Sequence, residues 1–387
     1  MTTATQLGID PEAIEAALDR NMTFPARWYS DPAIYDVELE HIFARSWQLV
    51  AHESRIARPG DHHVCQVAHV PVILTRGLDG ELRGFVNVCR HRAYPVATED
   101  GNRKTLQCAY HGWTYELDGC LRRAPRSERE PGFDRSEFSL MPVSVEVFHG
   151  FVFVNPDPAA PPLSEAYPEL EELWTLRNLD FSGFRYVSRS EYEIPANWKV
   201  WVENATECYH CPTIHRSSFG DAWEVDVDVY EYVNVGGLLA QFTPYNPRAK
   251  TYRPVNGDGD GSADGNGFRF VYIWPTSFFA VDDYVAFPGI IIPTGPESCR
   301  FVADFFVNPE CDATFVDEWL EMYNLTIAED CGAVLVQQPG LRSRMVPNGR
   351  LMPASESSIA HFHRLVWKSI AEAVGVAANG ASRNEPA

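Results

Sequence analysis

Two pairs of metal-ligating side chains constrain this chain more than any other feature of its sequence. Cys89 and His91 form a Cys-x-His pair, and Cys108 and His111 form a Cys-x-x-His pair. Short runs rich in β-branched and aromatic residues surround both pairs and are separated by Gly, Pro and Asp. This pattern is typical of strands joined by turns. We therefore expect two loops of an all-β module, each supplying one Cys and one His.

The presence of one Cys and one His in each pair distinguishes between the metal sites that two Cys and two His can form. Four such residues can also hold a tetrahedral zinc, but a zinc finger places its histidines three to five residues apart on one helix. A Rieske [2Fe–2S] cluster needs two thiolates on one iron and two imidazoles on the other, and the two mixed pairs match this need. Such a cluster transfers electrons at about −150 to +300 mV, so oxygen chemistry requires a second centre.

The stretch NWKVWVENATECYHCPTIH, residues 197 to 215, carries the second candidate site. His210 and His215 are five residues apart, so a regular α-helix would rotate them about 140° away from each other. Pro212 is expected to end or kink the helix, and a π-type widening would also bring positions i and i+5 together. Glu207, three residues before His210, is expected on the same helix face. Taken alone, two histidines at this spacing are more often core or capping residues than metal ligands, by roughly four to one.

Two histidines and one carboxylate with open coordination positions form the facial triad of non-haem iron(II) oxygenases. An electron-transfer cluster upstream favours this interpretation of His210 and His215, because the cluster needs an acceptor. The third ligand must come from elsewhere, and a predicted helix offers Glu329 and Asp330. Adjacent helical residues point in different directions, and the chemistry of the two carboxylates leaves the choice open.

The chain has nine cysteines among 387 residues. An odd number without secretory context indicates reduced thiols rather than a disulfide framework. Cys208 and Cys211 flank His210, and we interpret them as buried small apolar residues. Thiolate ligands at these positions would favour zinc or cluster iron over an oxygen-activating centre.

The charge of the chain bears on its partners. Lys and Arg number 32 against 53 Asp and Glu, which gives a formal net charge of −21. Nucleic-acid binders need a basic face, and anionic lipid attracts basic segments, so we expect neither partner. No apolar run approaches the length of a membrane span, and the N-terminus lacks the pattern of a signal peptide. These features predict a cytoplasmic protein.

Changes in residue pattern divide the chain into three parts. Residues 1–45 contain two helices with Asp-Pro starts, and residues 46–158 form the all-β module. A Pro-rich linker then leads into residues 159–387, where helices and aromatic-rich strands of an antiparallel sheet are expected. Residues 376–387 are predicted to be disordered. The run DGDGSADGNG superficially matches a calcium loop but lacks its required Gly and Glu, so we predict a solvated loop.

Together these motifs resemble the α subunits of Rieske non-haem iron ring-hydroxylating oxygenases, over nearly the whole chain. The resemblance is specific in the Cys/His pairs, in residues 197–215, and in EDCGAVLVQQPGLRSR with the later GRLMPASESSIAHFHR. It implies an α+β fold, with an all-β Rieske domain and a catalytic domain of antiparallel sheet covered by helices (helix-grip, START-like). It also implies two ligand sets: Cys89, His91, Cys108 and His111 for the [2Fe–2S] cluster, and His210, His215 and Asp330 for the mononuclear Fe(II).

The resemblance implies partners as well. Family members use O2 and receive electrons from NAD(P)H through a separate flavin or iron–sulfur reductase or a ferredoxin. They assemble as trimers or hexamers, in which each cluster lies nearest the mononuclear iron of the neighbouring subunit and a carboxylate bridges a His of each site. That bridging position maps to Glu207, with Asn204 three residues before it. An alternative assembly adds a β subunit.

The sequence from Asn204 to Glu207, followed by CYHC, looks like the branch containing choline monooxygenase, glycine betaine demethylase and the carnitine oxygenases. Many family members have Asp at the acidic position, and many ring dioxygenases have one more residue before it. Aromatic residues of the predicted sheet suit a trimethylammonium group, through cation–π attraction, and equally a stacked arene. The candidates for this lining are Trp223, Tyr230, Tyr232, Phe242, Tyr245, Phe268, Phe270, Tyr272, Trp274, Phe278 and Phe279. The leading hypothesis is hydroxylation and demethylation of an N-methyl group in a quaternary ammonium or betaine-type compound. The alternatives are mono- or cis-dihydroxylation of an aromatic acid and a Rieske electron-transfer protein without oxygenase activity.

Overall fold

The computed structural model describes residues 3–251 and 267–376. The chain forms two compact units, one of Phe43–Ala166 and one of Met1–Ile42 together with Tyr167–Ala387. The first unit is therefore an insertion in the sequence of the second. Apart from Gly267, the predicted Asp/Gly loop lies outside the described residues, and so does the predicted tail from residue 377 onward.

The inserted unit is an all-β module, as its short β-rich runs predict. Its larger sheet is antiparallel, with seven strands in the order β1 (Gln48–His52), β10 (Phe151–Asn155), β9 (Pro142–Phe148), β4 (Leu82–Val86), β3 (Val70–Arg76), β2 (Asp61–Val67) and β5 (Gly101–Asn102). A smaller sheet contains β6 (Thr105–Gln107), β7 (Thr114–Glu116) and β8 (Leu121–Arg123). The short helices of this unit are η2 (Phe43–Arg45), η3 (Glu53–Ile56), η4 (Ser127–Arg129), η5 (Arg135–Phe138) and α3 (Leu163–Ala166).

The second unit is built on one antiparallel sheet. Its seven strands follow the order β11 (Arg185–Ile194), β17 (Ser298–Val307), β16 (Val285–Gly295), β15 (Ser277–Val281), β14 (Phe268–Ile273), β13 (Leu238–Thr243) and β12 (Glu231–Val235). Six of these strands follow one another along the chain in a meander, and β11 joins the other edge beside β17. The strands from β13 to β17 are almost fully buried, so helices must cover the sheet.

The helices of this unit begin at side-chain caps that the sequence displays. Asp10, Asp31 and Asp312 each accept a backbone N–H of the first turn, which satisfies a donor that has no partner within the helix. The helices are α1 (Pro11–Asp19), η1 (Ala26–Tyr29), α2 (Pro32–His41), α4 (Leu170–Leu176), α5 (Trp198–Ala205), α6 (Cys211–Ile214), α7 (Phe219–Ala222), η6 (Val227–Val229), α8 (Ala313–Arg342) and α9 (Ser357–Ala373).

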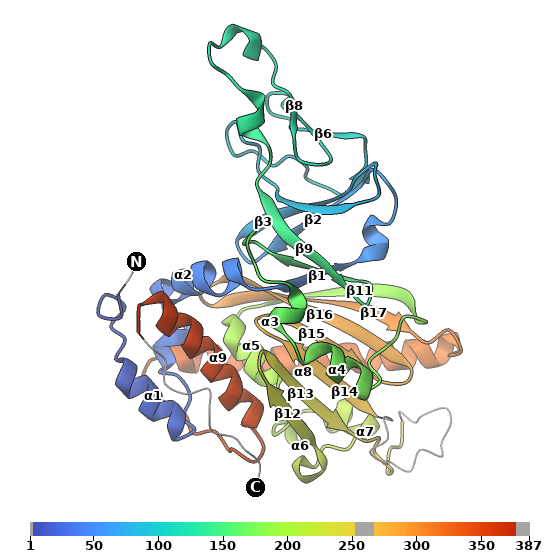
Figure 1. The fold of residues 1–387 in the computed structure, drawn as a ribbon. Coiled ribbons are helices and arrows are strands. Elements are labelled where there is room, and N and C mark those ends of the chain that lie inside the picture. The colour runs from blue at the N-terminus through green and yellow to red at the C-terminus, as the bar shows by residue number, and fades with distance from the viewer. Residues whose placement is uncertain (1–2, 252–266, 377–387) are drawn as a thin grey trace. The chain divides into compact units, whose positions relative to one another are not determined.

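Helices α8 and α5 frame one face of this sheet. Tyr323 of α8 packs against Phe287 of β16, with ring centroids 4.8 Å apart, and Trp319 packs against Tyr284 at 5.7 Å. Helix α5 contacts both α8 and β16. At the other end of the sheet, α9 contacts α1 and α2 as well as β12 and β13 (Figure 1).

Buried polar contacts fix α5 in place. Glu38 of α2 accepts hydrogen bonds from Lys199 Nζ at 2.5 Å and from Trp198 Nε1 at 2.8 Å. One helical turn later, Glu203 Oε1 lies 2.9 Å from Nε2 of His363 on α9. The side chains of Glu38 and Lys199 are fully buried, so each charge depends on the other. The position of α5 is therefore determined by α2 and α9, which lie at the two ends of the sequence.

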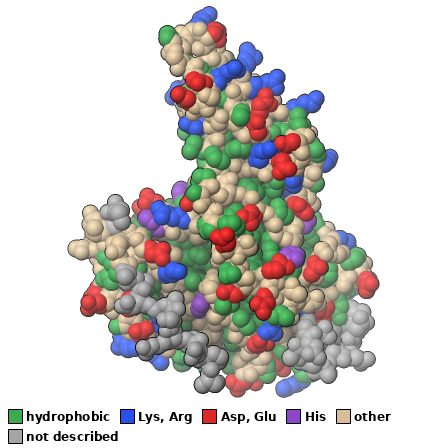
Figure 2. Space-filling view, viewed as in Figure 1, with side chains coloured by type: hydrophobic (Ala, Val, Ile, Leu, Met, Phe, Trp, Pro, Cys, Tyr) green, Lys and Arg blue, Asp and Glu red, His purple; other side chains and the backbone are tan. Residues whose placement is uncertain are grey.

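The surface carries charges of both signs. On the face in view, Lys and Arg side chains are interspersed with Asp and Glu (Figure 2). Among the described helices, none combines the length and the apolar composition needed to cross a membrane.

Candidate metal centres and active site

Two loops of the inserted unit carry the predicted cluster ligands, and their backbones repeat one pattern. The N–H of Ala93 donates to the carbonyl of Cys89, and the N–H of Gly112 donates to the carbonyl of Cys108, both at 3.0 Å. Ala93 and Gly112 both have left-handed backbones, with φ of 56° and 71°. Each loop therefore makes the same tight turn directly after its cysteine, and the predicted histidine lies within that turn.

The structure brings the four predicted ligands together. Cys89 and Cys108 are each 2% exposed, and burial followed by a hydrogen bond with Cys89 raises the pKa of the Cys108 thiol. His91 and His111 are exposed, and their ring centroids lie 4.6 Å apart. His91 stacks on Trp113 at 5.1 Å. Two thiols inside and two imidazoles outside give one pair of ligands for each iron, the division that a Rieske cluster requires.

The local structure of the second site differs from the prediction. His210 and His215 do not lie on a kinked continuation of α5, which ends five residues before His210; they flank the separate short helix α6. Pro212 starts this helix because a first-turn residue needs no N–H donor. The expected helix face shared by Glu207 and His210 is therefore wrong, although the turn still brings Glu207 Oε1 within 2.5 Å of His210 Nδ1.

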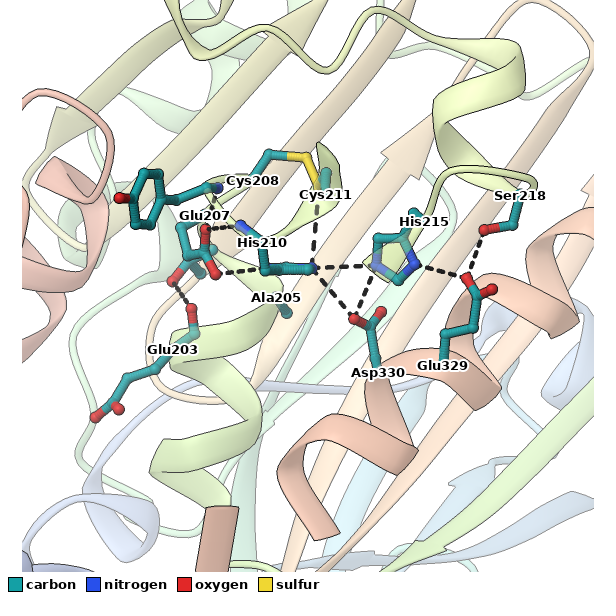
Figure 3. Close-up of polar contacts among 12 residues, drawn as sticks. Glu203, Ala205, Glu207, Cys208, His210, Cys211, His215, Ser218, Glu329 and Asp330 are labelled. Atoms are coloured by element: carbon teal, nitrogen blue, oxygen red, sulfur yellow. Dashed lines mark hydrogen bonds and ion pairs between the residues drawn. A yellow bond between two sulfur atoms is a disulfide. The ribbon is translucent and has the colours of Figure 1, made fainter. Parts of the chain in front are cut away.

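Three donor atoms converge between α6 and α8 (Figure 3). The Nε2 atoms of His210 and His215 are 3.1 Å apart. Asp330 Oδ1 lies 3.0 Å from His215 Nε2 and 3.3 Å from His210 Nε2. Donors that bind one ion through bonds of about 2.1 Å at right angles lie about 3 Å from each other. The three atoms therefore fit one face of an octahedral metal ion.

Glu329 lies on the other side of His215. Its Oε2 is 2.8 Å from His215 Nδ1 and accepts a hydrogen bond from Ser218 Oγ at 2.5 Å. Residues adjacent on a helix differ by about 100° in direction, so Glu329 and Asp330 reach the two different nitrogens of one imidazole (Figure 3). A carboxylate on Nδ1 fixes the tautomer that presents Nε2 to a metal.

Glu207 holds His210 in the same way. Its Oε1 contacts Nδ1 of His210, while its Oε2 accepts from the backbone N–H groups of Tyr209 and, at 3.2 Å, of His210. The carboxylate thus stabilises the turn before α6 and leaves Nε2 of His210 facing Asp330. Asn204, the other predicted catalytic residue, lines the adjoining cavity; its Oδ1 is buried and has no partner within the described part of the chain.

The electrostatics of the site favour a cation. Burial alone would lower the pKa of His210, but hydrogen bonds to Asp330 and Glu207 outweigh it and raise the pKa to about 10. Burial would raise the pKa of Asp330, but hydrogen bonds from His210 and His215 lower it to about 2. An ionised carboxylate thus faces two imidazoles, and a metal ion would bind there by displacing their protons.

Cys208 and Cys211 form a disulfide (Figure 3), so the interpretation of this pair as reduced thiols is wrong. The turn before α6 places their Cα atoms 5.0 Å apart, within the range that a disulfide requires. Both residues are buried, as expected, and the other seven cysteines are free. Cys211 Sγ lies 3.9 Å from His210 Nε2, but a disulfide sulfur is not a thiolate ligand.

A cavity of about 100 Å³ adjoins the three donors. Four of the aromatic residues highlighted in the sequence line it, namely Tyr230, Phe268, Phe270 and Phe278. Five further aromatic residues that sequence reasoning missed complete the lining, namely Trp201, Phe219, Phe287, Phe301 and Tyr323. Period-two alternation along strands could have indicated only Phe287 of β16 and Phe301 of β17. The other three, Trp201, Phe219 and Tyr323, lie on helices.

Both units match families of known proteins. Residues 46–145 match the Rieske [2Fe-2S] domain, and residues 181–372 match the catalytic domain of the ring hydroxylating alpha subunit. The carnitine monooxygenase oxygenase subunit of Acinetobacter pittii is 33% identical, over 92% of this chain and 97% of its own length. The chloroplastic choline monooxygenase of Spinacia oleracea is 28% identical over 88% of this chain and 76% of its own length.

Solved structures agree as well. A quaternary ammonium Rieske monooxygenase in complex with L-carnitine superposes with a TM-score of 0.79 at 31% identity, over 93% of this chain and 99% of that chain. Naphthalene 1,2-dioxygenase from Rhodococcus sp., bound to indole, has a TM-score of 0.79 at 21% identity, over 97% of this chain and 99% of that chain, and shows the shared fold.

The chain belongs to the Rieske ring-hydroxylating oxygenase α subunits, and it is the catalytic subunit of a Rieske non-haem iron oxygenase. The predicted α+β fold is confirmed. Family membership implies a Rieske [2Fe–2S] cluster and a mononuclear iron, and the two sets of converging side chains fit these groups.

Proposed function

We propose that this chain hydroxylates an N-methyl group of a quaternary ammonium or betaine-type substrate. The observation that carries the proposal is the cavity beside the three donors, which nine aromatic residues line. Aromatic faces attract a trimethylammonium group by about 2 kcal/mol when it is desolvated. Carnitine and choline, the compounds named for the relatives, both carry this group.

We assign the cluster to Cys89, His91, Cys108 and His111, and the mononuclear iron to His210, His215 and Asp330. A bound Fe(II) with open positions supplies the oxygen activation typical of the facial triad. Two outer carboxylates orient the imidazoles: Glu207 holds Nδ1 of His210, and Glu329 holds Nδ1 of His215. The aromatic lining holds the methyl groups near the donors and excludes water.

The reaction consumes one O2, two electrons and two protons. One oxygen atom enters a C–H bond of the methyl group, and the other leaves as water. The C–N bond of the resulting N-hydroxymethyl cation then breaks, which releases formaldehyde, the demethylated amine and one proton. The electrons originate from NAD(P)H and arrive through a separate reductase or ferredoxin, which reduces the cluster.

We also propose that the subunits assemble as a trimer or hexamer, in which Glu207 links the mononuclear site to a neighbouring cluster. Within one chain, this carboxylate already binds the imidazole of His210. Its position on a turn outside α5, rather than within the helix, is compatible with a second contact.

A single-turnover experiment tests the proposed reaction. Iron-loaded, chemically reduced protein is exposed to O2 with choline, carnitine, glycine betaine or aromatic acids, and formaldehyde, trimethylamine and ring-hydroxylated products are quantified. Formaldehyde from an N-methylated compound supports the proposal, and Asp330→Ala protein serves as the control for free iron. Ring hydroxylation without formaldehyde indicates an arene hydroxylase. Trimethylamine without formaldehyde indicates hydroxylation of the chain carbon next to nitrogen. Ring hydroxylation or trimethylamine release, each without formaldehyde, overturns the N-methyl assignment.

A further inference from the structure

The lining of the active-site cavity contains no Lys or Arg within the described ranges. Its ionisable groups, apart from cysteine and tyrosine, are the two histidines, Glu207 and Asp330. Arg269 lies between two lining phenylalanines of β14, but strand alternation directs it to the opposite face. There it forms an ion pair with Asp283 at 3.1 Å. The described cavity therefore offers no cation to a bound anion.

The charges around the iron site also disfavour an anion. Glu207, Glu329 and Asp330 surround the two imidazoles. When these three carboxylates are ionised, a divalent iron leaves one net negative charge. A substrate carboxylate in this cavity would be buried without a partner of opposite charge, which is strongly unfavourable. A monocation, in contrast, would compensate the excess negative charge.

The cavity offers neutral polar groups in place of a cation. Trp201 and Asn204 both lie on α5 and line the cavity. The Nε1 of Trp201 and the Oδ1 of Asn204 are buried and have no hydrogen-bond partner within the described part of the chain. Both groups are uncharged, so neither could neutralise the charge of a buried carboxylate.

We propose that this cavity selects N-methylated monocations whose remaining polar group is uncharged, and that it discriminates against compounds bearing a carboxylate. The inference rests on the proposed function and narrows its substrate class. Within the compounds named for the relatives, it favours the choline type, which has a hydroxyl, over the carnitine type, which has a carboxylate.

A matched pair of ligands isolates the effect of the carboxylate. 4-(Trimethylammonio)butanoate and its primary amide share the same cationic group and chain length. Their dissociation constants are measured without O2 on iron-loaded protein, by calorimetry or by quenching of tryptophan fluorescence. We expect the amide to bind at least about 10-fold more tightly, which corresponds to about 1.4 kcal/mol. Equal or tighter binding of the butanoate would overturn the inference.

A variant that adds a cation provides the second test. Gln241 of β13 is buried and lines the cavity, and its Nε2 donates to the carbonyl of Ala205 at 3.3 Å. Gln241→Arg should shift the affinity ratio at least about 10-fold toward the butanoate. Gln241→Met loses the same hydrogen bond without adding charge and should leave the ratio unchanged. An equal shift in both variants contradicts the inference, and the wild-type comparison decides the question if the Arg variant does not fold.

The binding and turnover measurements separate this inference from the proposed function. Tight, selective binding of the amide without formaldehyde in a single turnover supports the selectivity and overturns the proposed reaction. Equal affinity for both ligands with formaldehyde from each supports the proposed reaction and overturns the selectivity.

Discussion

Replacing Asp330 by Ala should remove the mononuclear iron and leave the visible absorption of the Rieske cluster unchanged. Asp330 Oδ1 is one of three donor atoms within 3.3 Å of one another, and it supplies the only negative charge among them. Structural zinc sites with four protein ligands bind with about 10–16 kcal/mol, or about 2.5–4 kcal/mol for each ligand, and we take this scale for the iron site. Loss of one ligand should therefore weaken iron binding about 100- to 1,000-fold. Iron per chain, measured after anaerobic gel filtration, should fall from about three to about two.

Glu329→Gln is the matched control, because it changes the adjacent carboxylate without removing a donor atom of the triad. A glutamine oxygen can still accept from Nδ1 of His215 and from Ser218, so we expect a loss in iron affinity near the lower end of the 10- to 100-fold range for outer partners. The cluster absorption reports folding in both variants. Full iron content in Asp330→Ala together with iron loss in Glu329→Gln would refute the assignment and make Glu329 the ligand.

Three further predictions address the electron path and stability. Glu207→Gln retains an oxygen that accepts from the N–H groups of its turn, but it loses the negative charge. Coupled turnover should therefore fall about 10- to 100-fold, while both metal sites stay filled. Normal turnover in this variant would contradict the assigned electron path. Lys199→Met leaves the carboxylate of Glu38 buried without its cation, so the free energy of unfolding in urea should fall by about 3–5 kcal/mol. The double variant Lys199→Met/Glu38→Leu should recover most of this loss. A double variant as unstable as the single one would refute the pairing. Burial raises the pKa of Asp282 to about 6, so the folded state binds more protons than the unfolded state between about pH 4 and 6 and loses stability as pH rises. Asp282→Asn should therefore gain up to about 3 kcal/mol relative to wild type between pH 4 and 7, and a constant difference across this range would show that the carboxyl is not perturbed.

The candidate cluster site could be predicted from sequence because the residues proposed to bind the cluster come from two short loops. Within each loop, Cys and His are two or three residues apart, so local spacing alone shows that they can face one ion. The iron site is harder, because Asp330 is more than a hundred residues from His215. Only the rotation of α8 about its axis shows that Asp330, and not Glu329, faces both Nε2 atoms.

The wrong predictions for residues 197–215 concern local structures for which the sequence supports two alternatives equally well. Pro212 is compatible both with breaking a helix and with starting one, and the second applies. Cys208 and Cys211 are separated by two residues, a spacing that can form a disulfide, but the odd number of cysteines pointed to free thiols. The cavity lining depends on strand register, which pairs residues as distant as Tyr192 and Phe301 and is not encoded locally.

The insertion of the Rieske unit within the catalytic unit has a consequence for synthesis on the ribosome. Domains generally fold as they emerge, at about 5–20 residues per second. The inserted unit is complete at Ala166, and the 207 residues from there to Ala373 at the end of α9 need about 10–40 s more at that rate. The N-terminal helices must wait through this interval, because the partners of Glu38 and of α1 lie on α5 and α9. The cluster can therefore be assembled before the mononuclear site exists, and the catalytic unit closes only when the last helix leaves the ribosome.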